Sequence, residues 1–291
     1  DAVSVAGTDL NFLLTNGVYD LQDELYLTMA CIVESVNGPD ETILVGSMGG
    51  SPTRVFNLAN APITIRGVTV SNGYSHWPVT WYLPVDNTAI IGNGGGFVCE
   101  GFTPVISNCV ITGCSGTWGG GTHGGRFIDC RFTGNEARQE GGGAAFARLI
   151  NCTVDGNVSS NHGGGVYKSY VSRSRLTGNR AHLGGGADES HLDACLVDRN
   201  TAGIGAGAWR SGLTNCTVTA NHAARRGGGI VGGTAVNSII YDNTSPASPN
   251  HEQAALTACC TMPVAGDGSI AGPPEMYDPA HISAGSVCAG A

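Results

Sequence analysis

Between residues 108 and 243, apolar and polar positions alternate in short segments that recur at a fixed spacing. Within one segment, for example, Cys130 and Phe132 alternate with Arg131 and Thr133. A period of two residues predicts a β-strand rather than a helix. The seven segments span residues 108–114, 129–135, 151–157, 173–179, 194–200, 215–221 and 237–243, and successive segments begin 21 or 22 residues apart.

A glycine cluster keeps step with these segments. It occupies residues 119–121, 141–143, 163–165, 184–186, 205–207 and 227–229, with Ala206 at the centre of the fifth. Equivalent short strands separated by glycine-rich turns can stack in parallel, with each repeat forming one full turn of a coil. The pattern predicts an all-β, single-stranded, right-handed parallel β-helix of about ten coils, each of 21–22 residues.

The repeat weakens toward both ends of the chain. Residues 42–46 and 63–73 have strand patterns that indicate earlier rungs. We expect a single domain over residues 1–291. Its parts would be irregular N-terminal coils (1–73), an inserted loop (74–92), regular coils (93–243) and a C-terminal cap (244–291).

Composition excludes several classes of protein. Glycine accounts for 46 of 291 residues, but 41% are hydrophobic and the glycines lack a three-residue period, so the chain is neither collagen-like nor disordered. A net charge of −9 with 14 basic residues argues against nucleic acid as a partner. No apolar stretch approaches the ~20 residues that span a bilayer. The chain starts at Asp1, not Met, which predicts removal of a signal peptide or a shortened sequence.

Five of the eleven cysteines fill the second position of the repeat, a position that serine also fills. These residues are Cys109, Cys130, Cys152, Cys195 and Cys216, with Ser174 and Ser238 in the same slot. Stacked equivalent residues lie about 4.8 Å apart, whereas disulfides need Cβ atoms about 3.8 Å apart. We therefore expect a buried ladder of free thiols and no metal site, because no histidine shares the slot. One disulfide is expected among Cys259, Cys260 and Cys288, with its pairing left open.

The last position of the segment is asparagine in six of the seven copies. We expect these residues to accept left-handed backbone and to bond to one another from rung to rung. The glycine clusters suit tight corners with positive φ and are not phosphate loops, because no Gly-Lys-Ser/Thr motif follows them.

Two further features resemble known families. Phe132-Thr133-Gly134-Asn135 followed by Gly141-Gly142-Gly143-Ala144 resembles the paired FxxN and GGA repeats of chlamydial polymorphic outer membrane proteins. Most copies here replace Phe with Val, Leu or Ile, and GGA with GGG. The two ends, near residues 17–21 and 283–291, resemble those of pectate-lyase-like β-helix domains of secreted bacterial proteins. The resemblance implies a bacterial secreted or cell-surface location but no single activity.

Candidate functional residues follow each glycine cluster, where the copies differ most and where we expect exposed side chains. In order of rungs they are His123 and Arg126; Phe146 and Arg148; Tyr167, Lys168 and Tyr170; Asp188, Glu189 and His191; and Trp209 and Arg210. Stacking would gather aromatic, cationic and acidic groups into one lateral groove. Such a surface suits recognition of a polysaccharide or another surface ligand, as in an adhesin or carbohydrate-recognition module.

The alternative function is an enzyme, a polysaccharide lyase that cleaves a uronate-containing chain by β-elimination. Lys168 or His191 would then be the base, Tyr170 the acid and Arg148 the carboxylate clamp. A glycosidase would need carboxylates clustered on adjacent rungs. It is less favoured, because the one neighbouring pair of the patch, Asp188 and Glu189, is adjacent in sequence and would point to opposite faces of a strand. No cofactor is predicted, and calcium at Asp188, Glu189 and Asp193 is left open.

The inserted loop carries Trp77, Trp81 and Tyr82. These rings could stack on sugars or cover the N-terminal coils, and the sequence does not separate the two roles. A third interpretation of the whole chain is a structural spacer without activity. The sequence predicts neither the glycan nor the oligomeric state.

Overall fold

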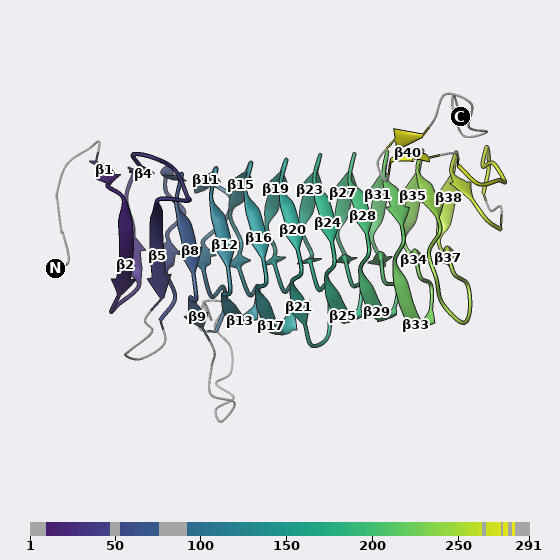
Figure 1. Ribbon diagram of the computed structural model, residues 1–291, viewed down its shortest axis with the longest axis horizontal. Coiled ribbons are helices and arrows are strands. Elements are labelled where there is room, and N and C mark those ends of the chain that lie inside the picture. Colours follow the sequence, from purple (N-terminus) through teal and green to yellow (C-terminus); the bar gives the residue numbers. More distant parts are fainter. Residues whose placement is uncertain are drawn as a thin grey trace.

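The computed structural model describes residues 10–46, 53–75, 92–263, 266–274, 276–278 and 281–282. These residues form a right-handed parallel β-helix whose coils advance steadily from the N-terminal to the C-terminal end (Figure 1). The described part of the chain contains strands and no helix. The predicted fold class is therefore confirmed.

Four parallel sheets, here called A to D, run along the helix. Sheet A has eleven strands: β1 (Leu10–Leu14), β4 (Cys31–Ser35), β7 (Ile63–Arg66), β11 (Val105–Ser107), β15 (Arg126–Ile128), β19 (Arg148–Ile150), β23 (Tyr170–Ser172), β27 (His191–Asp193), β31 (Gly212–Thr214), β35 (Thr234–Val236) and β38 (Ala255–Thr257). Sheet B also has eleven: β2 (Gly17–Leu21), β5 (Thr42–Gly46), β8 (Thr69–Ser71), β12 (Val110–Thr112), β16 (Arg131–Thr133), β20 (Thr153–Asp155), β24 (Arg175–Thr177), β28 (Leu196–Asp198), β32 (Thr217–Thr219), β36 (Ile239–Tyr241) and β39 (Cys260–Thr261).

Sheets C and D complete each coil. Sheet C has ten strands: β3 (Leu25–Leu27), β6 (Phe56–Leu58), β10 (Phe97–Cys99), β14 (Thr122–His123), β18 (Ala144–Ala145), β22 (Val166–Tyr167), β26 (Ala187–Asp188), β30 (Ala208–Trp209), β34 (Ile230–Val231) and β37 (His251–Glu252). Sheet D has seven: β9 (Tyr74–Ser75), β13 (Ser115–Trp118), β17 (Glu136–Glu140), β21 (Val158–Ser159), β25 (Arg180–Leu183), β29 (Thr201–Ile204) and β33 (His222–Arg226). An antiparallel pair, β40 (Met276–Asp278) and β41 (His281–Ile282), lies near the C-terminus.

Each regular coil visits the sheets in the order A, B, D and C. The chain runs through β15, β16, β17 and β18 and then re-enters sheet A one rung higher as β19. The strands pair in register, so that Phe127 lies beside Leu149 and Phe132 beside Val154. Equivalent positions of the repeat therefore form continuous rows along the rod.

The apolar rows point inward and make one elongated core. Phe127, Leu149 and Phe132 are fully buried. The rings of Phe127 and Phe132 meet edge to face at 5.0 Å, an arrangement that aromatic pairs favour. The period-two pattern thus identifies the core correctly.

The cysteine slot is a row of buried free thiols, as predicted. The Cys130 thiol donates to the carbonyl of Ile128 at 3.2 Å, and the Ser174 hydroxyl donates to the carbonyl of Ser172 at 2.7 Å. Both side chains make the same bond two residues back, which explains why either residue fills the slot. At the C-terminal end, Cys260 is disulfide-bonded and Cys259 is a free thiol, whereas Cys288 lies outside the described residues.

The last-position asparagines form a buried hydrogen-bonded ladder. The Asn157 side-chain amide donates to Asn179 Oδ1 at 3.0 Å, and the Asn179 amide donates to Asn200 Oδ1 at 3.0 Å. The expectation of left-handed backbone at these asparagines is wrong. Positive φ occurs instead at the first position of each segment, such as Asn151 (φ 53°) and Arg173 (φ 49°).

The coil continues beyond the last sequence copy at residue 243. Strands β37, β38 and β39 extend sheets C, A and B by one more rung. Asn250 closes the asparagine ladder there, because its Oδ1 accepts the side-chain amide of Asn243 at 3.2 Å. Sequence periodicity ends earlier than the coil because Asn250 supplies the same hydrogen bond from a different spacing.

Candidate functional site

The glycine clusters make the sharpest corner of each coil, between sheets D and C. Gly163 has φ +60°, and a Cβ on Gly164 would lie 2.5 Å from the backbone of Arg180, so a larger residue there requires the backbone to shift. Ala206 fills the equivalent position two coils later. This tight turn sets the residue before the cluster beside the residues after it. We call the surface formed by these flanking residues the D–C corner.

Aromatic rings form a connected series along the D–C corner, which we call the aromatic row. His123 lies 5.1 Å from Phe146 and Phe146 lies 5.7 Å from Tyr167, both measured between ring centroids. The His162 ring lies 6.0 Å from the rings of both Tyr167 and Trp209. The five rings come from four coils and form one connected series along the rod. His162 and Tyr167 belong to the same coil, and His162 reaches Trp209 past the coil of Asp188.

Two cations lie over these rings. Lys168 Nζ is 5.0 Å from the ring centroid of Tyr167 and 5.9 Å from that of Phe146. The Arg210 guanidinium carbon is 4.1 Å from the ring centroid of Trp209. Lys168 also pairs with Glu189 at 3.4 Å. Cations over aromatic faces combine a charged group with an apolar platform on one surface.

Asp188 is the buried polar group of this corner. Its side chain has no exposed area, and its Oδ2 lies 2.8 Å from Nδ1 of His162. Its second oxygen, Oδ1, has no hydrogen-bond partner among the described residues. Burial raises the pKa of Asp188 to about 7, although its contact with His162 acts in the opposite direction. His162 itself is partly exposed, with 31% of its side chain accessible.

His123 continues the aromatic row toward the N-terminal coils. Burial lowers the pKa of His123 to about 4, and the positive charge of Arg54 adds to this effect. Arg54 is buried and pairs with Glu24 at 2.9 Å. The His123 ring is therefore neutral near pH 7 and contributes an uncharged aromatic face to the row.

The structure divides the predicted site residues between two surfaces. Eight lie on the surface that follows the glycine clusters, which is part of the D–C corner as defined above. His123, Tyr167, Asp188 and Trp209 end strands of sheet C, and Phe146, Lys168, Glu189 and Arg210 begin the turn from sheet C to sheet A. The other four follow one another in a row of sheet A: Arg126, Arg148, Tyr170 and His191. The expectation that all of them are exposed is wrong for Tyr167, which is 7% exposed, and for Asp188, which is fully buried. The preceding residues of the same strands, Val166 and Ala187, belong to the apolar core, whereas Lys168 lies over Tyr167 and His162 contacts Asp188.

The four predicted lyase residues are placed accordingly. Tyr170 and His191 stack on the exposed face of sheet A, with ring centroids 5.2 Å apart, and Arg148 neighbours Tyr170 in the same row. Lys168 contacts Tyr167, Phe146 and Glu189 at the D–C corner instead. Three of the four thus share a row and the lysine belongs to the other surface.

Sequence reasoning missed His162 and Glu140. Both occupy the position just before a glycine cluster, and they are bridge partners on neighbouring rungs. The same position holds Trp118, Leu183, Ile204 and Arg226 in other copies, so it varies as much as the positions after the cluster. That variability is a signal available in the sequence. Trp77, Trp81 and Tyr82 lie outside the described residues.

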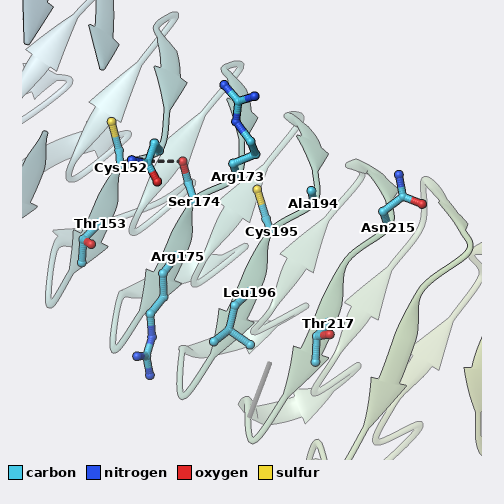
Figure 2. Close-up of a pocket in the computed structure, with 11 residues that line it drawn as sticks. Cys152, Thr153, Arg173, Ser174, Arg175, Ala194, Cys195, Leu196, Asn215 and Thr217 are labelled. Carbon is cyan, nitrogen blue, oxygen red and sulfur yellow. Dashed lines mark hydrogen bonds between the residues drawn. The ribbon is translucent and has the colours of Figure 1, made fainter. Parts of the chain in front are cut away.

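A shallow groove follows a different edge of the rod, the A–B corner, where sheet A turns into sheet B. It has a volume of about 480 Å³ and is lined by the cysteine slot and its neighbours, including Arg173, Arg175 and Asn215. Figure 2 shows that Arg173 and Arg175 point away from each other. Asp198 holds Arg175 through hydrogen bonds of 3.1 and 2.9 Å. None of the predicted site residues lines this groove.

The chain matches the NosD family, described as periplasmic copper-binding protein, over residues 59–253. The chain belongs to the NosD family. No curated protein matches it closely. The described residues contain no helix long and apolar enough to cross a membrane.

Among solved structures, the rice weevil pectin methyl esterase is 14% identical, with a TM-score of 0.35, over 64% of this chain and 70% of that one. The Dettilon tailspike protein is 10% identical, with a TM-score of 0.47, over 90% of this chain. The chain spans 55% of the tailspike's length. Both likenesses concern the fold alone.

The described residues do not fit a copper ion. No three His, Cys, Asp or Glu side chains among them come together as a metal-binding group, and this includes Asp188, Glu189 and Asp193. The stacked thiols donate to backbone carbonyls, as Cys216 does to Thr214 at 3.1 Å. Burial raises the pKa of the Cys130 thiol well above its usual value, whereas metals bind the thiolate.

Proposed function

We propose that this NosD-family β-helix protein binds a glycan along the D–C corner, outside the bacterial cytoplasm. The observation that carries the proposal is the aromatic row, in which five rings from four coils form a connected series and two cations lie over them. Aromatic faces offer sugars a flat apolar platform, and nearby charged groups fix their orientation. The resemblance to chlamydial surface repeats and the periplasmic description of the family support the location.

The exposure of the row agrees with a binding surface. Phe146 is 37% exposed, and Trp209 and His162 are partly exposed. Tyr167 lies deeper, beneath Lys168. A ligand lying along the rod would therefore contact rings at several rungs in turn, which suits an extended chain of sugars better than a single small molecule.

The experiment is a glycan array probed with the wild-type protein and with a Phe146→Ala/Trp209→Ala double variant. We expect the wild type to retain one class of polysaccharide and the double variant to lose at least tenfold in affinity, about 1.4 kcal/mol. The variant's melting temperature must match the wild type for the comparison to count. Binding that survives both substitutions, or no retention of any glycan, would contradict the proposal and favour a structural spacer.

The alternative of a lyase at Arg148, Tyr170 and His191 stays a prediction. The stacking of Tyr170 on His191 is the observation that favours it. Its test is the release of unsaturated uronate by wild-type protein and by Tyr170→Phe. Loss of that product in the variant would support a site on sheet A.

A further inference from the structure

His162 and Asp188 are arranged as a base and the group that orients it. The Asp188 carboxyl is fully buried, and Asp188 lies between Tyr167 and Trp209 in sheet C. Its one hydrogen-bonding partner among the described residues is His162 Nδ1 at 2.8 Å. A buried carboxylate that accepts the Nδ1 proton leaves the lone pair of an imidazole on Nε2. Because His162 is partly exposed, Nε2 is the ring nitrogen available to a ligand on the row.

The surroundings of the pair favour proton abstraction over hydrolysis. Within the described residues, the ring of His162 makes no hydrogen bond to a hydroxyl that could serve as a nucleophile. Asp188 is fully buried and cannot contact a sugar as one carboxylate of a glycosidase pair. Elimination needs only a base, a proton donor and a cation near the substrate carboxylate.

We propose that His162 is the base of a proton-abstracting site on the aromatic row that acts on uronate-containing polysaccharide, with Asp188 as its positioning residue. The proposal rests on the proposed binding of glycan at the D–C corner. Nearby groups supply the cation and the proton donor that elimination also requires. Arg210 lies against the same Trp209 ring as His162 and makes no ion pair within the described residues, so it can neutralise the uronate carboxylate.

Tyr167 supplies the proton donor. Burial raises the pKa of its phenol, so the hydroxyl remains protonated near neutral pH. In the step, Nε2 of His162 removes the proton from uronate C5, and the electron pair of that C–H bond forms the C4=C5 double bond. The C4–O bond breaks, and the leaving oxygen takes the Tyr167 proton. Imidazolium and phenolate then exchange the proton through solvent, so no water, oxidant or metal is consumed.

The test follows the ultraviolet absorbance of the unsaturated uronate during incubation with polygalacturonate, alginate and hyaluronan. We expect product from at least one of them and a loss of at least 100-fold in kcat/KM for His162→Gln. The matched control is His222→Gln, which removes an exposed histidine of sheet D that bonds Thr244 instead. Its kcat/KM should remain that of the wild type.

Asp188→Asn tests the positioning role without removing volume. Glu140, Glu189 and His162 are the titratable groups that act on Asp188, and Lys168 pairs with Glu189. The wild-type kcat/KM should rise as pH increases through about 7, where Asp188 ionises, because only its carboxylate accepts the Nδ1 proton. The Asn variant should be at least tenfold slower and lose this rise.

The remaining outcomes are distinct. An undiminished kcat/KM for elimination in His162→Gln overturns the proposal. Loss of the unsaturated product in Tyr170→Phe alone moves the site to sheet A. A wild type that binds polysaccharide without releasing unsaturated product also overturns it but leaves the binding function standing. A wild type that does neither refutes both.

Discussion

The A–B corner and the D–C corner are built by the same coil but hold different kinds of residue. At the A–B corner the rungs from residue 108 to residue 259 repeat one solution, a first residue with positive φ followed by a cysteine or serine that bonds two residues back. At the D–C corner the glycine cluster alone repeats, and its flanking residues differ from rung to rung. The first corner maintains the stacking, whereas the second presents a varied surface.

The difference arises from how the backbone N–H and C=O groups of each turn find hydrogen-bond partners. The A–B turn uses side-chain hydrogen bonds to the backbone, so its side chains are committed to the scaffold. In the D–C turn, the backbones of neighbouring glycine clusters bond to each other, as in the bond from Gly142 N–H to the Gly163 carbonyl at 3.0 Å. The flanking side chains are then free to specialise. In this molecule a corner made of glycine is the place where chemistry can vary.

The largest effect that separates the corners should be the pH dependence of stability from Asp188. Burial raises its pKa from 3.8 to about 7, so the folded state holds this proton more tightly than the unfolded state. The resulting stability is fully present below about pH 4 and is lost as pH rises through about 7, on the order of 4 kcal/mol. Urea unfolding across this range measures it.

Two variants sharpen that prediction. Asp188→Asn should flatten the dependence, whereas Asp193→Asn, an exposed carboxylate beside the A–B corner, should leave it unchanged. Equal pH profiles for wild type and Asp188→Asn would show that Asp188 is not the proton-binding group.

The next effect tests the glycine corner itself. Gly164→Ala should lower the free energy of unfolding by about 3 kcal/mol, because the new Cβ would lie 2.5 Å from the backbone of Arg180. Gly156→Ala is the control. Its Cβ would have no neighbour within 4 Å, so only the strain of φ +63° remains, about 1 to 2 kcal/mol. Similar losses in the two variants would mean that close packing does not define the D–C corner.

The smallest effect should come from the A–B corner. Cys152→Ser should change the free energy of unfolding by less than about 1 kcal/mol, because Ser174 already makes the equivalent bond to the carbonyl two residues back. Thermal unfolding measures the change. A loss of several kcal/mol would show that the sulfur packing is needed and that the slot is not interchangeable.

The contrast also explains what the sequence could predict. The scaffold can be predicted from the sequence because in-register stacking requires the same residue types in each coil. The structural roles of Cys152, Asn157 and Gly163 are therefore indicated by their recurrence. The pairing of His162 with Asp188 could not be predicted, because His162 precedes one glycine cluster, Asp188 follows the next, and neither residue recurs. Recurrence also misplaced the left-handed residue. Asparagine fills the last position in six of the seven copies, but positive φ occurs at the first position, where asparagine stands in four.

The most direct test of the account is the affinity of one bound polysaccharide for two single variants, one at each corner. Trp209→Ala removes a ring of the aromatic row, and Arg173→Ala removes an exposed cation from the A–B groove. Titration calorimetry should show at least a tenfold loss for Trp209→Ala and no change for Arg173→Ala. A loss confined to Arg173→Ala would place the ligand in the A–B groove and contradict the assignment of function to the D–C corner.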